Sequence, residues 1–244
     1  MTNTDSSAYG DGLADLFDNW YGEKASTDCV QVLHRLAGAG SVLELGVGTG
    51  RVAVPLAEMG HSIVGVDSSS EMIEQLLSKK HTGVDVRQDD MVTASFERKF
   101  TMAYCVDNTL FLLPDQNSQV ATFRNVARHL EPSGRFIIEV PARVPQLGPE
   151  DHGLLLDRLE EGRMSFWAVQ HDRVHQTLEM QQVFLVGGDT RLQYVPIRYA
   201  WPSELDLMAQ IAGLTLEQRL GDWDGAAFAN HSTSNISIYR KEAS

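Results

Sequence analysis

The sequence predicts a doubly wound α/β fold built on a mostly parallel sheet. Over the first 141 residues, short apolar runs alternate with amphipathic stretches of helical length, an order that produces a parallel sheet with helical crossovers. One strand-to-helix junction also carries three glycines at alternate positions, Gly46, Gly48 and Gly50. Such junctions are where doubly wound sheets bind nucleotide-like ligands. The 244 residues suffice for one domain of this kind with additions.

Apolar runs bounded by turn residues predict the strands, and apolar residues on one face of a 3.6-residue period predict the helices. The expected helices of the first part cover residues 11–21, 27–36, 52–58, 70–78 and 117–130. The expected strands cover residues 41–45, 62–67, 84–88, 101–106 and 135–140.

The pattern changes after Pro141. Residues 148–162 are expected to form a loop or a short helix. Three successive antiparallel strands, a β-meander separated by short turns, are predicted over residues 164–171, 174–186 and 191–199. The chain then returns to a helix, with Ser203 as its N-cap, and to two strands, over residues 203–212, 215–220 and 236–240.

The composition is that of a globular protein and limits its partners. Hydrophobic residues make up 43% of the chain and charged residues 22%, and no apolar run reaches the roughly 20 residues of a membrane helix. Residues 1–7 are polar, without a signal-peptide core, and are expected to form a frayed tail. Two cysteines make no disulfide framework, which favours a cytoplasmic protein. The net charge of −13, without a basic cluster, disfavours nucleic acid as a partner.

The glycine-rich turn, Glu44-Leu45-Gly46-Val47-Gly48-Thr49-Gly50, is the strongest functional signal. Glycine permits backbone angles that a side chain forbids and lets a ligand approach the main chain closely. No Gly-Lys-Ser/Thr follows, so a phosphate-binding loop is not predicted. The second and third glycines are separated by one residue, whereas the dinucleotide-binding fingerprint separates them by two.

The pattern Glu-x-Gly-x-Gly-x-Gly resembles motif I of class I S-adenosylmethionine (SAM) methyltransferases. The resemblance implies a Rossmann-like methyltransferase fold with a seven-stranded, mostly parallel sheet. The meander is then an insertion after the fifth strand, and the last two strands form a closing antiparallel hairpin. The resemblance also implies that Glu44 binds the amino group of SAM.

Asp67 ends the second expected strand, 17 residues after Gly50. An acid at this position accepts hydrogen bonds from the ribose hydroxyls in nucleoside-binding α/β folds. The run Asp67-Ser68-Ser69-Ser70-Glu71-Met72 resembles the methyltransferase pattern Asp-x-Ser-x-x-Met, which implies that Ser69 lies at the site and that Met72 packs on the adenine. The alternative role for Asp67 is that of a helix cap.

Polar residues follow the third and fourth strands as well. Asp90 and Met91 resemble the family's Asp-Met pair, which implies contacts to the adenine, while Asp89 is expected to be solvated. Asn108 and Thr109 end the fourth strand and are expected to face the sulfonium and the acceptor. The following stretch resembles bacterial small-molecule methyltransferases and lacks the Asn/Asp-Pro-Pro-Tyr signature of enzymes that methylate DNA bases or protein glutamine.

Two positions are expected near the methionine end of SAM. Phe17-Asp18-Asn19-Trp20-Tyr21 resembles the family's Tyr-Asp-x-x-Tyr pattern, in which Tyr21 fits and Phe17 departs. Aromatic packing on the sheet is the alternative interpretation. Arg51 either pairs with the SAM carboxylate or lies on the surface.

Candidates for the acceptor side come from the meander and its surroundings. His171 is a candidate general base, with Tyr21 and Arg198 as further candidate catalytic residues. His171 and His175 flank a turn, but no third ligand accompanies them, so no metal site is predicted.

We therefore expect a single domain over residues 1–244, with a helical lid, a SAM-binding core, an acceptor-side insertion, and a last helix with the closing strands. Their expected limits are 1–37, 38–141, 148–200 and 201–244. The predicted function is SAM-dependent methylation of an oxygen or nitrogen of a small-molecule acceptor, a specialised metabolite, with S-adenosylhomocysteine as product. The protein is expected to be a monomer or homodimer. Two alternatives remain open: a non-catalytic SAM-sensing or partner-binding protein, and a nicotinamide-dependent oxidoreductase, for which the glycine spacing is wrong.

Overall fold

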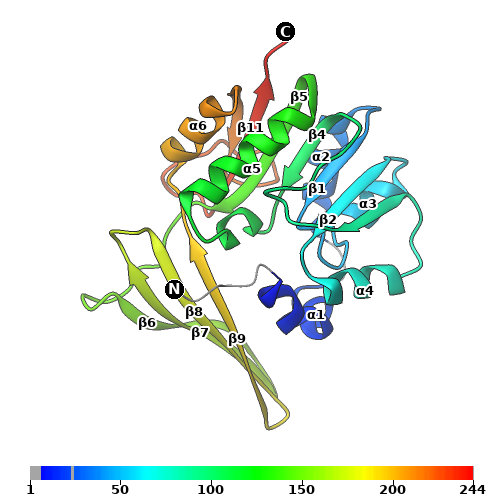
Figure 1. Cartoon of the computed structure of the whole chain (residues 1–244). Coiled ribbons are helices and arrows are strands. Elements are labelled where there is room, and N and C mark those ends of the chain that lie inside the picture. The colour runs from blue at the N-terminus through cyan, green and yellow to red at the C-terminus, as the bar shows by residue number, and fades with distance from the viewer. Residues whose placement is uncertain (1–6, 23–24, 244) are drawn as a thin grey trace.

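Seven strands form one sheet in the order β10-β11-β5-β4-β1-β2-β3 (Figure 1). The computed structural model describes residues 7–22 and 25–243, so most of the expected N-terminal tail lies outside the described residues. The strands are β1 (Val42–Leu45), β2 (Ile63–Asp67), β3 (Val84–Gln88), β4 (Phe100–Cys105), β5 (Leu130–Pro141), β10 (Leu214–Leu220) and β11 (Ser234–Lys241). Strands β1 to β5 pair in parallel, and β11 is antiparallel to both β5 and β10.

The strand order reverses between β1 and β4. From β1 the chain proceeds outward through β2 and β3, and it then returns to the other side of β1 for β4 and β5. The connections after β1 and β4 therefore leave the sheet in opposite directions, and a crevice opens at the carboxyl ends of these two strands.

Helices cover both faces of this sheet because successive side chains of each strand point to opposite sides. On one face, Val42, Ile63 and Met102 pack with residues of α2 and α3. On the other face, their neighbours Leu43, Val64 and Ala103 pack with residues of α5 and α6. The helices are α1 (Ala8–Tyr21), α2 (Thr27–Ala37), α3 (Ala53–Glu58), α4 (Ser70–Ser78), the 3₁₀ helix η1 (Thr109–Leu112), α5 (Gln116–His129) and α6 (Pro202–Ile211).

The inserted meander has four antiparallel strands in a separate sheet of sequential order. They are β6 (His152–Glu160), β7 (Arg163–Asp172), β8 (Thr177–Val186) and β9 (Asp189–Arg198). The expectation of a loop or short helix over residues 148–162 is wrong, because β6 fills most of this segment. Its run of leucines has no strand-like alternation, and it becomes a strand through backbone pairing with β7.

The start of α6 also differs from expectation. Trp201 is the N-cap and Pro202 the first helical residue, so Ser203 lies inside the helix. Proline favours this position because its ring fixes φ at a helical value and the missing N–H would have no partner there.

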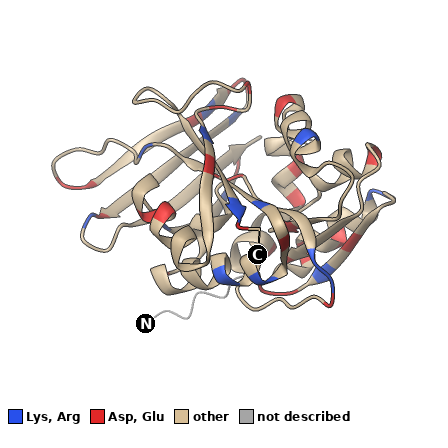
Figure 2. Cartoon of the chain, turned by 90° about the horizontal axis from the view of Figure 1, so that it is seen from above, with Lys and Arg blue, Asp and Glu red and all other residues tan. Residues whose placement is uncertain are grey.

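Acidic and basic residues are interspersed over the described part of the chain, and Figure 2 shows no continuous basic stripe on it. Among the residues that the structure describes, no helix has the length and apolarity needed to span a membrane.

Candidate cofactor and acceptor site

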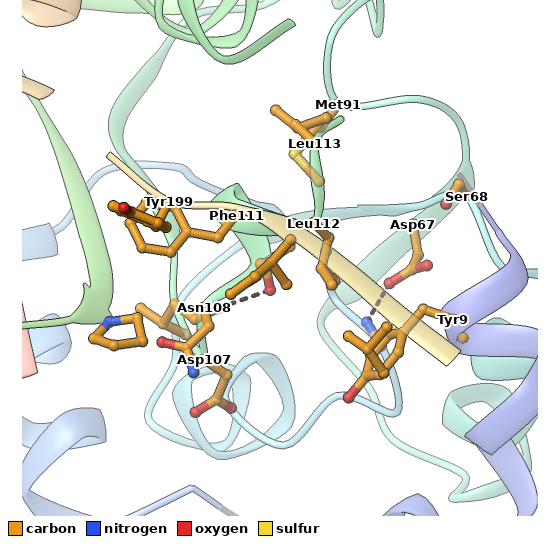
Figure 3. A pocket seen from close by; sticks show the side chains of 18 of the residues that line it. Tyr9, Asp67, Ser68, Met91, Asp107, Asn108, Phe111, Leu112, Leu113 and Tyr199 are labelled. Atoms are coloured by element: carbon orange, nitrogen blue, oxygen red, sulfur yellow. Dashed lines mark hydrogen bonds between the residues drawn. The ribbon is translucent and has the colours of Figure 1, made fainter. Parts of the chain in front are cut away.

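A cavity of about 440 Å³ lies between the carboxyl edge of the central sheet and the meander. Its lining comes from the turns after β1, β2, β3 and β4, from α1, and from β7, β8 and β9. Figure 3 shows Tyr9 and Asp67 toward one end and Phe111 and Tyr199 toward the other. Most of the sequence-predicted cofactor residues line it: Tyr21, Glu44, Gly46, Gly48, Arg51, Asp67, Met72, Asp90, Met91, Asn108 and Thr109.

The three glycines of the turn have left-handed backbones and three different surroundings. A Cβ on Gly46 would lie 2.4 Å from Cγ2 of Thr109, and one on Gly50 would lie 2.2 Å from Cδ1 of Leu76. A Cβ on Gly48, at φ +51°, would meet no atom within 4 Å. Gly48 borders the cavity and Gly50 does not. Gly48 therefore keeps a space open for a ligand, whereas Gly50 permits close packing of the helices behind the turn.

Asp67 connects the ends of β1 and β2. Its Oδ2 accepts a hydrogen bond from the Gly48 amide at 2.7 Å, and its Oδ1 accepts one from the Ser69 amide at 2.9 Å. Burial raises the pKa of this carboxyl above its ordinary value, against the opposing effect of these amides. Asp67 thus holds the turn in place and also presents a carboxylate to the cavity.

Glu44 is the most deeply buried acid of the cavity, with 3% of its surface exposed. Its Oε2 accepts a hydrogen bond from the Tyr104 hydroxyl at 2.7 Å. Burial, the largest cause, raises the pKa of Glu44 well above its ordinary value, and Asp107 and Asp67 raise it further. A cationic group in the cavity would favour the charged form and offset this cost.

The turn after β3 brings Asp89, Asp90 and Met91 to the cavity. Oδ1 of Asp90 accepts a hydrogen bond from the Val92 amide at 2.8 Å, and the Asp90 amide donates to Asp89 Oδ1 at 2.8 Å. Asp89, expected to be solvated, is also part of the lining.

The segment after β4 has an unusual backbone. Asp107 and Asn108 are consecutive non-glycine residues with left-handed φ values of +53° and +65°. Such conformations concentrate at functional sites, where the surrounding structure compensates for their strain. Asp107 Oδ2 accepts a hydrogen bond from Arg51 Nη1 at 3.0 Å, so the two side chains form an ion pair.

Helix α1 covers the end of the cavity near Asp67 through Tyr9, Gly10, Phe17 and Tyr21. The Tyr21 hydroxyl donates to Oε1 of Gln182 on β8 at 3.0 Å. Burial raises the pKa of both tyrosines. Tyr9 was not predicted from the sequence, because it lies before the expected start of the helix and outside the aromatic pattern.

The opposite side of the cavity is apolar. Its side chains come from η1 and from the face of the meander that is turned toward the central sheet: Phe111, Leu112, Leu113, Trp167, Leu178, Met180, Val195 and Ile197. Tyr199 adds a hydroxyl, which lies 3.1 Å from Nε2 of His171. Arg143 is the cation on this side.

Four predicted residues lie outside the lining. Gly50 packs behind the turn, and Ser69 caps α4 by accepting a hydrogen bond from the Met72 amide. His171 lies behind Tyr199. Arg198 is buried between α5 and α6, where it donates to Oε1 of Gln119 at 2.7 Å and to Glu204 at 2.5 Å.

His175 is exposed and contacts Asp172 at the meander turn, away from the cavity. Within the described ranges no cluster of three or more potential metal ligands is present.

The comparisons with known proteins agree with this geometry. Residues 42–134 match the methyltransferase domain family. The chain is 30% identical over 215 residues, 86% of each protein, to a cypemycin N-terminal methyltransferase from a Streptomyces species. Its structure resembles that of the CcbJ methyltransferase from Streptomyces caelestis, with a TM-score of 0.91, 34% identity, and coverage of 98% of this chain and 100% of that one. A SAM-bound amino pentose methyltransferase, CalS10 of Micromonospora echinaspora, shares the fold, with a TM-score of 0.71, 18% identity, and coverage of 93% and 96%.

The chain belongs to the class I SAM-dependent methyltransferases. Its cofactor is S-adenosylmethionine and its product S-adenosylhomocysteine, which excludes the nicotinamide-dependent alternative. The cavity fits this cofactor. The open side of Gly48 admits a ligand beside the main chain, and the carboxylates of Glu44 and Asp67 suit an ammonium group and ribose hydroxyls.

Proposed function

We propose that the protein methylates an amine nitrogen of a small, largely apolar acceptor, a specialised metabolite. The observation that carries this proposal is the apolar side of the cavity, formed by η1 and the meander. None of the eight histidines and no carboxylate contributes to that side, whereas the carboxylates of the lining gather on the cofactor side.

The chemistry of the two acceptor types differs in its need for a base. A neutral hydroxyl must lose its proton as it reacts, so it needs a general base within hydrogen-bond reach. An amine needs only to be bound in its uncharged form. An apolar pocket lowers the pKa of a bound amine and thereby favours that form. The apolar lining therefore supports methylation of a nitrogen more directly than methylation of an oxygen.

We assign the cofactor contacts as the motifs imply. Glu44 binds the ammonium group, Asp67 the ribose hydroxyls, and Asp90 with Met72 and Met91 the adenine. When bound, SAM supplies a methyl group on a sulfonium, whose leaving group is a neutral thioether. The apolar residues exclude water and hold the acceptor nitrogen in line, and such alignment supplies much of the acceleration in displacement reactions.

One relative adds support for nitrogen as the atom that accepts the methyl group. The name of the cypemycin enzyme describes an N-terminal methyltransferase, and this chain matches most of its length. An amino group on a larger apolar molecule is therefore included in the proposed acceptor class.

Oxygen methylation is the second candidate, and one contact favours it. Tyr199 borders the cavity, and its hydroxyl lies 3.1 Å from His171 Nε2. Together they form a path by which a proton from an acceptor hydroxyl can reach His171. This is the role the structure allows for the predicted base, through Tyr199 rather than by direct contact.

The test is turnover of a panel of paired amines and alcohols on matched apolar frameworks, with S-adenosylhomocysteine release as the readout. We expect the amines to react, with little loss in Tyr199→Phe or His171→Asn. Preference for alcohols, with a large loss in both variants, would establish the oxygen alternative. Binding of SAM without turnover of any acceptor would favour the sensing protein.

A further inference from the structure

The four-stranded sheet has a second apolar face, turned away from the cavity. Strand pairing aligns its side chains in rows that cross all four strands. One row is Leu156, Phe166, Val183 and Leu192, and the adjacent row is Leu154, Ala168, Gln181 and Tyr194. A third row is Leu159, Met164, Leu185 and Thr190. We call these twelve residues the outer face.

The outer face is exposed in the described chain. Leu154, Leu156 and Leu159 on β6 are 71%, 64% and 70% exposed, and Leu192 and Tyr194 on β9 are 60% and 46% exposed. The intervening residues of the other face, such as Leu178, Phe184 and Val195, are buried. Figure 1 shows the sheet projecting from the molecule with α1 against one side. The α1 residues Trp20 and Tyr21 contact Phe184 and Gln182, which belong to the buried face.

The size of this face is that of the core of a protein interface. Strands are ~4.8 Å apart and rise ~3.4 Å per residue, so twelve outward residues over about six positions of four strands cover roughly 400 Å². A standard interface buries ~800 Å² on each partner, of which this face would form the apolar centre. Monomeric proteins rarely expose an apolar patch above a few hundred Å².

We propose that the outer face packs against the outer face of a second copy of this chain. Two flat sheets pack face to face at ~10 Å through interdigitating side chains, and a two-fold axis makes such an interface self-complementary. The three rows contain no charged residue. Glu179 lies in the adjoining row of the same side, with His152, Gln170 and Pro196, so pairing keeps like charges to the edge of the interface even though each chain carries a net charge of −13.

Charge also favours a second copy of the chain, rather than a lipid surface, as the partner of the outer face. Residues 152–198 contain no lysine, and their five arginines are outnumbered by six acidic residues. They offer no excess of positive charge to anionic lipids, which repel a chain with this net charge. Exposed edge strands of solvated sheets commonly carry charges that prevent association. The twelve outer-face positions on β6 to β9 carry none.

The experiment is sedimentation equilibrium of the full chain at micromolar concentrations, compared with the variants Leu156→Glu and Leu192→Glu. We expect a wild-type mass of twice 27.0 kDa. Each substitution places two buried charges in the dimer and should raise its dissociation constant at least ~100-fold. Leu77→Glu is the matched control, because Leu77 is 57% exposed on α4, outside the outer face. It should remain dimeric.

The melting temperature and its increase with SAM show that each variant is folded and binds its cofactor. A monomeric wild type at tens of micromolar would overturn the proposal. Dimers that survive both outer-face substitutions, or that dissociate equally in Leu77→Glu, would also overturn it.

Discussion

At the residue scale, Gly46, Gly48 and Gly50 share a motif and a left-handed backbone but act differently. Gly46 makes room for Thr109, Gly50 makes room for Leu76, and Gly48 leaves open the space that borders the cavity. Substitution at Gly48 and at Gly50 should therefore affect different properties of the protein.

Gly48→Ala should remain folded but lose SAM affinity by at least ~100-fold, because its Cβ would enter the part of the cavity that we propose for the cofactor. Its backbone strain should cost about 1–2 kcal/mol of unfolding free energy. Gly213→Ala is the matched control, since Gly213 also has a left-handed φ, +78°, and no atom near its Cβ. Calorimetric titration with SAM and urea denaturation measure both effects. Normal affinity in Gly48→Ala would mean that the glycine serves the turn alone.

Glu44 should make SAM binding pH-dependent. Burial raises its folded-state pKa above the ordinary value of 4.5, so its ionisation destabilises the free protein. That cost is absent below about pH 4.5 and complete above the raised pKa. The free energy of unfolding should fall as pH rises through this window, and the ammonium of SAM should offset the loss.

The measurement is the melting temperature with and without SAM between about pH 5 and pH 8. The stabilisation by SAM should grow with pH in the wild type and be nearly flat in Glu44→Gln, where no carboxylate titrates. If the stabilisation by SAM depended on pH equally in the wild type and in Glu44→Gln, an acid other than Glu44 would bind the ammonium group of SAM.

At the element scale, α1 connects the two sheets over the cavity. Its Asp11 accepts a hydrogen bond from Ser69 of α4's N-cap, and its Tyr21 donates to Gln182 of β8. The helix packs in a small cluster of its own with Leu13, Trp20 and Phe184. The buried Trp20 Nε1 has no hydrogen-bond partner in the described structure. A small cluster with an unsatisfied donor is the kind of unit that opens locally.

Helix α1 should therefore become more protected when SAM binds. Amide exchange in α1 should slow by up to ~100-fold at a SAM concentration 100 times its dissociation constant, if opening requires release of the ligand. Helix α5, packed in the main core, serves as the control and should change little. Equal exchange of α1 with and without SAM would show that the helix does not cover the cofactor.

At the scale of the whole molecule, the cavity is lined by the turns after four strands of the central sheet and by helix α1, so binding of the cofactor there should stabilise the fold globally. SAM or S-adenosylhomocysteine at 100 times its dissociation constant should add about 2.7 kcal/mol. For a domain of this size that corresponds to roughly 5–10 °C in melting temperature. NADH at the same concentration is the control and should have no effect. Equal stabilisation by NADH would contradict the cofactor assignment.

Much of the fold was predictable because its signals are local. A buried strand, a glycine turn and a helix occupy about twenty consecutive residues around Gly48, so their physical causes can be read within one short segment. The alternation of strands and helices predicted the mostly parallel sheet in the same way, and the resemblance to the family implied its seven strands. The place of Asp67 and Asn108 at the cavity followed from the rule that ligands bind at the carboxyl ends of parallel strands, and that of Asp90 from its resemblance to the family's Asp-Met pair.

The acceptor side depended on contacts between distant segments. The sequence placed Arg198 near the site, but alternation along β9 directs Ile197 to the cavity and Arg198 to Gln119 and Glu204. Strand β6 exists because β7 supplies its hydrogen bonds, and His171 reaches the cavity only through Tyr199. The sequence by itself determined the fold class and the cofactor family, since both arise from local backbone requirements. Only the tertiary structure decided which face of each meander strand lines the cavity and which is exposed, because that depends on what packs against the sheet.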